Sequence, residues 1–217
     1  MATRLAFVLA MVLMASTGCL TRPGGALAPL ALPPESRSVT LEYTVGDFEF
    51  TLEGGKMITS NKAGRDLNEQ LLRRWKKKGY VSEFSYVESS RFTGKADYQL
   101  VLTGSQYGDS SIGAQILSGL TLLLLPYTVN TSYDVQYTLE KVATGERYSA
   151  TVEDSFHTTV ELLLFLAAPV SMRGFSSTMD AMSDHLYQQL RDKGAFAPPA
   201  PGSAMGRPLS AADLAAR

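Results

Sequence analysis

The sequence predicts an α+β domain in which helices pack on one side of a mostly antiparallel sheet. Several segments alternate apolar and polar residues, as half-buried strands do. Two others place apolar residues at steps of three or four residues, as amphipathic helices do. The chain has 217 residues, of which 45% are apolar, and this is enough for one core. The expected element order is ββ-α-ββ-α-ββ-α-α, within a domain that spans residues 37–194.

The domain opens with two predicted strands. Apolar residues alternate along residues 39–45 and again along 48–52, and Gly46-Asp47 between them resembles a turn. We therefore expect a strand pair over residues 38–45 and 47–53.

A helix is predicted over residues 61–78. Ser60 or Asn61 can cap its start, and Gly79 is suited to end it. Leu67, Leu71 and Trp75 form its apolar stripe.

Strands are expected next over residues 80–87 and 97–105. The clearest pattern is a hairpin in which residues 133–139 and 148–152 alternate on either side of a turn at 143–146. A helix follows over residues 177–193, with Ser177 and Asp180 as a capping pair and Gly194 at its end. Its predicted stripe is Met179, Met182, Leu186 and Leu190.

Two apolar runs flank this hairpin. No charged residue lies between Asp109 and Asp134, and the first run ends at Pro126. We expect a helix over 111–124, capped by Asp109 or Ser110, and a second helix over 159–168. The second run is too short to span a membrane. A span of the first run alone would separate the hairpin from the strands before it, so we expect neither run to span. The runs are therefore core elements, a ledge that rests on a bilayer, or a self-association surface. The residues assigned to this surface are Leu120, Leu122, Leu123, Leu124, Leu163 and Phe165.

The N-terminus carries an export signal. Arg4 precedes an apolar stretch from Leu5 to Ala15, which is too short to span a bilayer. Thr17, Gly18 and Cys19, the single cysteine, follow it. This segment resembles the lipobox of bacterial lipoproteins, although Ser16 stands where that family prefers an aliphatic residue. The resemblance implies that residues 1–18 are a cleaved signal peptide and that Cys19 is lipidated. Two or three acyl chains anchor a protein stably.

The anchor has two further implications. Leu20 follows the cysteine, and in the lipoprotein family the absence of Asp there implies the periplasmic face of the outer membrane; an inner-membrane anchor is the alternative. Residues 19–36 are rich in Pro, Gly and Ala, which indicates a flexible tether. Residues 195–217 are predicted to be a disordered tail with a short helix near the end.

The residue inventory offers little chemistry. One cysteine excludes a disulfide framework and a thiolate metal cluster within the chain. His157 near Asp154 and His185 beside Asp184 are predicted to be surface residues, so we expect no catalytic site, metal or cofactor. A net charge of −1 gives no reason to expect nucleic acid. A basic cluster could meet lipid headgroups or a partner, or simply be a solvated helix end; it comprises Arg73, Arg74, Lys76, Lys77 and Lys78.

The sequence is similar to small envelope lipoproteins of proteobacteria. Its order of elements also resembles the small α/β domain that precedes the propeller in TolB. These resemblances imply a non-enzymatic accessory component of an envelope assembly or transport complex, with an unidentified protein partner. The alternatives are a protein that binds acyl chains and, third, a periplasmic hydrolase.

Overall fold

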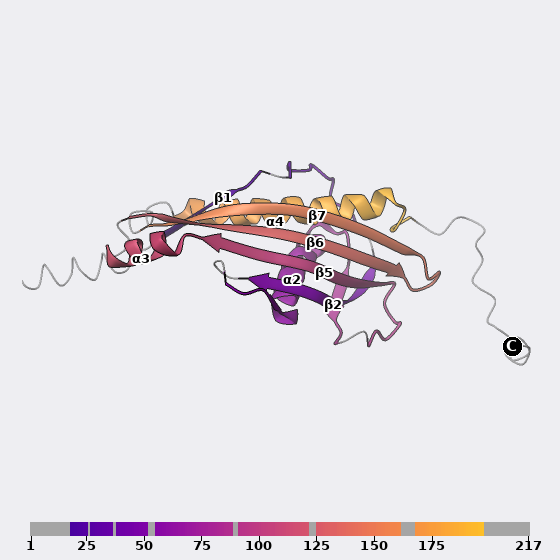
Figure 1. Ribbon diagram of the computed structural model, residues 1–217. Helices are drawn as coiled ribbons and strands as arrows, with labels where there is room; N and C mark the ends of the chain where they lie inside the picture. Colours follow the sequence, from indigo (N-terminus) through magenta and orange to yellow (C-terminus); the bar gives the residue numbers. More distant parts are fainter. Residues whose placement is uncertain are drawn as a thin grey trace, which may run out of the picture.

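The computed structural model confirms the α+β class: a seven-stranded, mostly antiparallel sheet carries helices on one side (Figure 1). The described residues are 18–25, 27–36, 38–51, 55–88, 91–121, 125–161 and 168–197. The strand order is β1-β7-β6-β5-β2-β3, and β4 also pairs with β2. The described helices are α2, α3 and α4.

The predicted hairpin is the centre of the sheet. Strands β6 (Tyr127–Lys141) and β7 (Arg147–Glu161) pair from Tyr127↔Val160 to Glu140↔Arg147. Alternate residues such as Val135 and Val152 are buried beneath the helices, while the residues between them face outward. The alternation in the sequence is thus explained by one covered and one open face.

Strand β5 (Tyr98–Ser110) extends the sheet antiparallel to β6, from Tyr98↔Lys141 to Ser110↔Val129. It is longer than the predicted strand over 97–105. At about 3.3 Å per residue, the 13 residues of β5 span roughly 40 Å along the sheet.

The expected strand pair over 38–45 and 47–53 is wrong. Residues Thr40–Thr51 form one strand, β2, which lies parallel to β5. Its register shifts between Val45 and Phe48, so Gly46-Asp47 is a bulge and not a turn. Strand β3 (Ile58–Thr59) pairs antiparallel with β2, and β4 (Glu83–Tyr86) pairs parallel with it.

Helix α2 (Asn61–Lys78) agrees with the prediction at both ends. The Ser60 side chain accepts a hydrogen bond from the Ala63 N–H, and Gly79 adopts a left-handed conformation with φ of 75°. The predicted stripe of Leu67, Leu71 and Trp75 is buried.

Helix α4 (Ala168–Asp192) starts earlier than the predicted helix over 177–193. Ser177 is therefore not a cap; its hydroxyl donates to the Gly174 carbonyl inside the helix. The predicted stripe of four residues is fully buried, and Gly194 lies just beyond the end with φ of 88°. The helix expected over 159–168 is also wrong at its start, because Thr159–Glu161 belong to β7.

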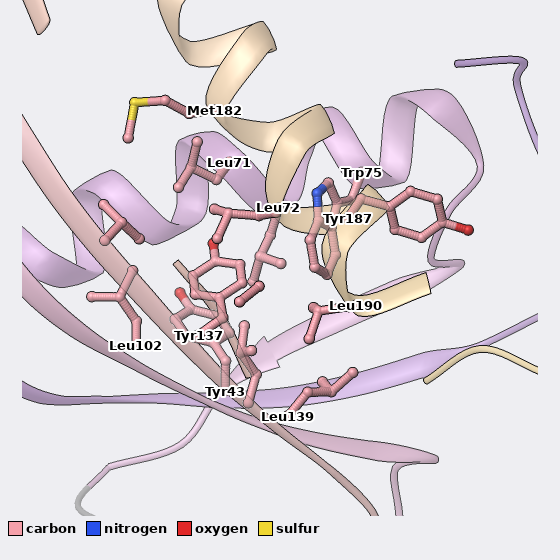
Figure 2. Packing of buried hydrophobic residues seen from close by; sticks show 14 of the residues in the cluster. Tyr43, Leu71, Leu72, Trp75, Leu102, Tyr137, Leu139, Met182, Tyr187 and Leu190 are labelled. Carbon is pink, nitrogen blue, oxygen red and sulfur yellow. The ribbon is translucent and has the colours of Figure 1, made fainter. Parts of the chain in front are cut away.

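Helices α2 and α4 meet over an aromatic core (Figure 2). The Trp75 ring packs edge-on against Tyr137 and Tyr187, and its N–H donates to the Ser183 carbonyl at 2.9 Å. Phe196, which the sequence assigned to a disordered tail, is 3% exposed and contacts Trp75. The folded domain therefore extends past 194; residues 198–217, including the expected terminal helix, lie outside the described residues.

The segment predicted to be a flexible tether contacts the domain over much of its length. Strand β1 (Gly18–Pro23) pairs antiparallel with β7. Further along, Leu27 and Leu32 pack against the core. Glu35 accepts hydrogen bonds from Tyr187 at 2.9 Å and from Arg191 at 3.1 Å. Leu27, Leu32 and Glu35 thus hold this Pro-rich segment against the domain.

Candidate functional site

One end of the sheet holds both the predicted lipidation residue, Cys19, and the first apolar run (Figure 1). At this end β5 and β7 finish, β6 begins and β1 begins. Cys19 pairs with Val160, and Val160 pairs with Tyr127. Because neighbouring strands lie about 4.8 Å apart, the Cys19 backbone is roughly 10 Å from the start of β6. We call this the Cys19 end.

Helix α3 (Ile112–Leu120) projects from the Cys19 end, between β5 and β6. It lies within the predicted range of 111–124, but its cap is Ser111 and not Asp109 or Ser110; the Ser111 hydroxyl accepts from the Ala114 N–H at 3.3 Å. The core interpretation of this run is wrong for α3. Leu120 is 78% exposed and Ile112 is 65% exposed.

The polar side chains of α3 are turned toward the domain. Ser118 is fully buried, and its hydroxyl donates to the Leu125 carbonyl at 2.6 Å. The Gln115 side chain donates to the Ser110 hydroxyl. The apolar residues Ile112, Ile116 and Leu120 recur every four residues on the exposed side. In an ordinary surface helix the apolar side is buried and the polar side is exposed, so α3 shows the reverse arrangement.

Sequence reasoning named Leu120 but missed Ile112, Ile116 and Leu117 as part of this surface. The available signal was the i, i+4, i+8 spacing of Ile112, Ile116 and Leu120 on the side of the helix opposite Ser118. The remaining predicted residues of the two runs, namely Leu122, Leu123, Leu124, Leu163 and Phe165, lie outside the described residues.

The predicted basic cluster does not lie at the Cys19 end. Helix α2 ends near the opposite end of the sheet, where the Lys78 carbonyl accepts from the Glu35 N–H and Ser82 donates to the Val39 carbonyl. Val39 directly precedes β2, whose first residues pair with the start of β5. The cluster and α3 are therefore separated by most of the length of β5, which is roughly 40 Å.

The cluster is also divided between two roles. Arg74 binds Asp180 at 2.7 Å and Lys78 binds Asp184 at 2.6 Å, so these two cations join α2 to α4. Arg73 contacts Glu69 at 3.4 Å on its own helix. Lys76 and Lys77 are exposed.

The Lys78–Asp184 pair shapes its surroundings. The Asp184 side chain is 4% exposed. Tyr80 stacks on Tyr187 with ring centroids 3.8 Å apart, and its hydroxyl is 3.5 Å from Asp184. Burial, followed by the negative charge of Asp184, raises the pKa of Tyr80 from 10.0 to about 12.

The two histidines do not assemble with the nearby aspartates into a catalytic group. His157 is exposed and its Nδ1 lies 2.6 Å from the Asn130 side-chain oxygen, whereas Asp154 is buried beneath the sheet. His185 contacts the Ala28 carbonyl at 2.9 Å. Within the described ranges, no cluster of three metal-ligating side chains occurs.

Of the helices that the structure describes, none combines the length and the apolar character that a membrane crossing requires.

Known proteins resemble this chain only distantly, and only in their structures. No family model and no curated protein matches the chain. Among solved structures, a DUF330 protein from Xanthomonas campestris is similar at a TM-score of 0.39 and 12% identity, covering 80% of this chain and 95% of that one. A minor lipoprotein from Acinetobacter baumannii matches at 0.32 and 11%, covering 71% and 94%. The PelC dodecamer from Paraburkholderia phytofirmans matches at 0.29 and 17%, covering 74% and 98%. Scores this low support no conclusion about function.

Proposed function

We propose that this chain is a lipid-anchored, non-enzymatic protein of the bacterial envelope, acylated at Cys19 and held at the periplasmic face of the outer membrane. The observation that carries the proposal is the place of Cys19. It follows the apolar stretch Leu5–Ala15 after three small residues, and it stands at the start of an edge strand. Cleavage before Cys19 would remove one β1–β7 pair, Gly18↔Glu161, and leave the pairs from Cys19↔Val160 to Pro23↔Phe156.

An accessory role is supported by the open face of the sheet. Outward residues such as Asp134, Gln136 and Glu153 are exposed and polar, so this face can meet a protein partner without a large apolar patch. The partner is an unidentified component of the envelope.

The acyl-binding alternative has weaker support. A hollow of about 580 Å³ lies at the start of β5 and is lined by Tyr98 and Phe196, but also by Asp97 and Lys141. The interior between the helices and the sheet is filled by aromatic side chains such as Trp75. The hydrolase alternative lacks an assembled histidine–aspartate pair at either histidine.

The anchor is tested by intact mass and labelling. The chain and its Cys19→Ala variant are expressed in a Gram-negative host fed an alkyne-bearing fatty acid. We expect label and acyl mass on a mature chain that begins at Cys19, and neither in the variant. A mature chain that begins elsewhere and carries no acyl mass would refute the anchor.

The accessory role is tested by crosslinking in intact cells, with Cys19→Ala as the control. We expect one specific envelope protein to be captured by the anchored chain and lost or reduced in the control. Recovery of the same abundant bystanders from both would count against the role.

A further inference from the structure

The exposed apolar side chains of the described residues are not scattered. The large ones are Met57, Ile58, Tyr107, Ile112, Ile116, Leu117, Leu120 and Leu125. Ile58 pairs with Phe50, which pairs with Gln106, so β3 flanks the second half of β5. All these side chains therefore lie in the half of the molecule that contains the Cys19 end.

The chain outside the described residues also attaches at this end. The apolar segment from Leu5 to Ala15 precedes β1, whose first residue is Gly18. Residues 122–124 connect α3 to β6, and residues 162–167 connect β7 to α4. These connecting residues are Leu and other apolar types throughout. Three apolar stretches, far apart in sequence, thus join the fold at one place.

The composition of this end suits hydrocarbon. No charged residue occurs between Asp109 and Asp134, so contact of α3 with lipid tails buries no charge from that stretch. The polar side chains of α3, Gln115 and Ser118, already have partners within the domain. The outer side of the helix presents Ile and Leu, and an interfacial helix buries such a face about 5–10 Å into the headgroup and acyl boundary.

We propose that α3 is a membrane-docking helix: its Ile112, Ile116, Leu117 and Leu120 side chains enter the periplasmic leaflet beside the acyl chains of Cys19. This rests on the lipid anchor proposed above and adds an orientation to it. The domain stands on its Cys19 end, and the turn between β6 and β7 points away from the bilayer. The basic cluster at the end of α2 is then turned away from this membrane, and its exposed Lys76 and Lys77 face the periplasm.

Tryptophan quenching by brominated lipid tests the contact directly. The single native tryptophan, Trp75, is fully buried and provides a constant background. The mature, full-length protein is reconstituted into phosphatidylethanolamine–phosphatidylglycerol vesicles with or without bromine on the acyl chains. Leu120→Trp places a reporter on the docking helix, and Ala143→Trp places a matched, exposed reporter at the opposite end.

We expect bromine to reduce the added Leu120→Trp emission about twofold, since the side chain lies at acyl depth. Emission from Ala143→Trp and from the native protein should stay unchanged. Equal emission of Leu120→Trp in both kinds of vesicle would overturn the docking helix.

A mass spectrum of the same samples separates the two proposals. Acyl additions without quenching overturn the docking helix and leave the anchor intact. Quenching without acyl additions overturns the anchor and leaves α3 as the membrane contact. If bound protein is unquenched and is dimeric in detergent, and Ile116→Ser with Leu120→Ser makes it monomeric, the surface serves a second copy and the docking proposal is wrong.

Discussion

Replacement of Phe196 by alanine should destabilise the domain by about 3–5 kcal/mol. The ring is 3% exposed, and burial of a phenylalanine contributes about 1.5–3 kcal/mol. It also contacts Trp75, Tyr98 and Tyr187, with ring centroids 6.2, 5.3 and 5.1 Å away. Aromatic pairs at such distances add about 0.5–1.5 kcal/mol each, although the three share one ring and do not sum.

Urea unfolding, followed by far-ultraviolet circular dichroism in a Cys19→Ala background, measures this loss. With a denaturant slope of about 2 kcal/mol/M, the midpoint should fall by roughly 1.5–2.5 M. Phe196→Leu is the matched control, because it keeps most of the apolar volume and should cost less than about 1.5 kcal/mol. Truncation after Gly194 should cost at least as much as Phe196→Ala.

An unchanged midpoint for both Phe196→Ala and the truncation would refute the reasoning. It would mean that the domain ends at residue 194, as the sequence alone predicted, and that the Phe196 ring contributes nothing to the core.

Three further changes test other parts of the fold. Gly104→Ala should reduce expression of folded protein or cost several kcal/mol in urea unfolding, because Gly104 has φ of 138° and a Cβ there would lie 2.0 Å from the Asp134 carbonyl oxygen. Wild-type stability of this variant would contradict the close approach of β5 to β6 at Gly104. Lys78→Met should cost roughly 2–3 kcal/mol in the same assay, because it leaves the buried Asp184 carboxylate without a counter-charge. The loss is below the roughly 3–5 kcal/mol of fully buried pairs because Lys78 is 30% exposed. Asp184→Asn in the Lys78→Met background should recover part of the loss, and no recovery would show that the unpaired carboxylate is not its cause. Finally, because the pKa of Tyr80 is raised to about 12, the folded state holds its proton more tightly than the unfolded state. Its stabilising contribution is full below pH 10 and is lost as pH rises toward 12. The chain has ten tyrosines, so the titration of Tyr80 is isolated as the difference in absorbance at 295 nm between the native protein and Tyr80→Phe. This difference should develop above pH 10, toward 12; its full development at pH 10 in the folded protein would contradict the raised pKa.

The parts of the fold that local chemistry determines were predictable. Helix α2 has a serine cap, a buried stripe and a terminal glycine, all within its own residues. The β6–β7 hairpin could be read from alternation because one face is covered and the other is open.

The errors arose where distant contacts decide. Gly46-Asp47 interrupts an alternating pattern in the same way whether the chain reverses or bulges, and pairing with β5 selects the bulge. Phe196 precedes a Pro-rich tail, and its neighbours in sequence do not indicate that its ring packs against Trp75 and Tyr98. The strand β1 exists because β7 offers an edge.

The sequence indicated the apolar run of the candidate site but not its exposure or its position beside Cys19. The absence of charge between Asp109 and Asp134 marked the run, but core and surface helices of such composition look alike in sequence. The meeting of α3, Cys19 and the start of α4 at one end depends on strand directions, and these follow from the whole topology.

The placement of β1 has a mechanical consequence. If the bilayer holds Cys19, any force on the anchor acts along β1 and loads the β1–β7 hydrogen bonds in shear, so they must fail together and not one at a time. A flexible linker would extend under a force exerted by a bound partner and would transmit little of it to the folded domain. This attachment instead transmits the force directly into β7 and, through it, into β6.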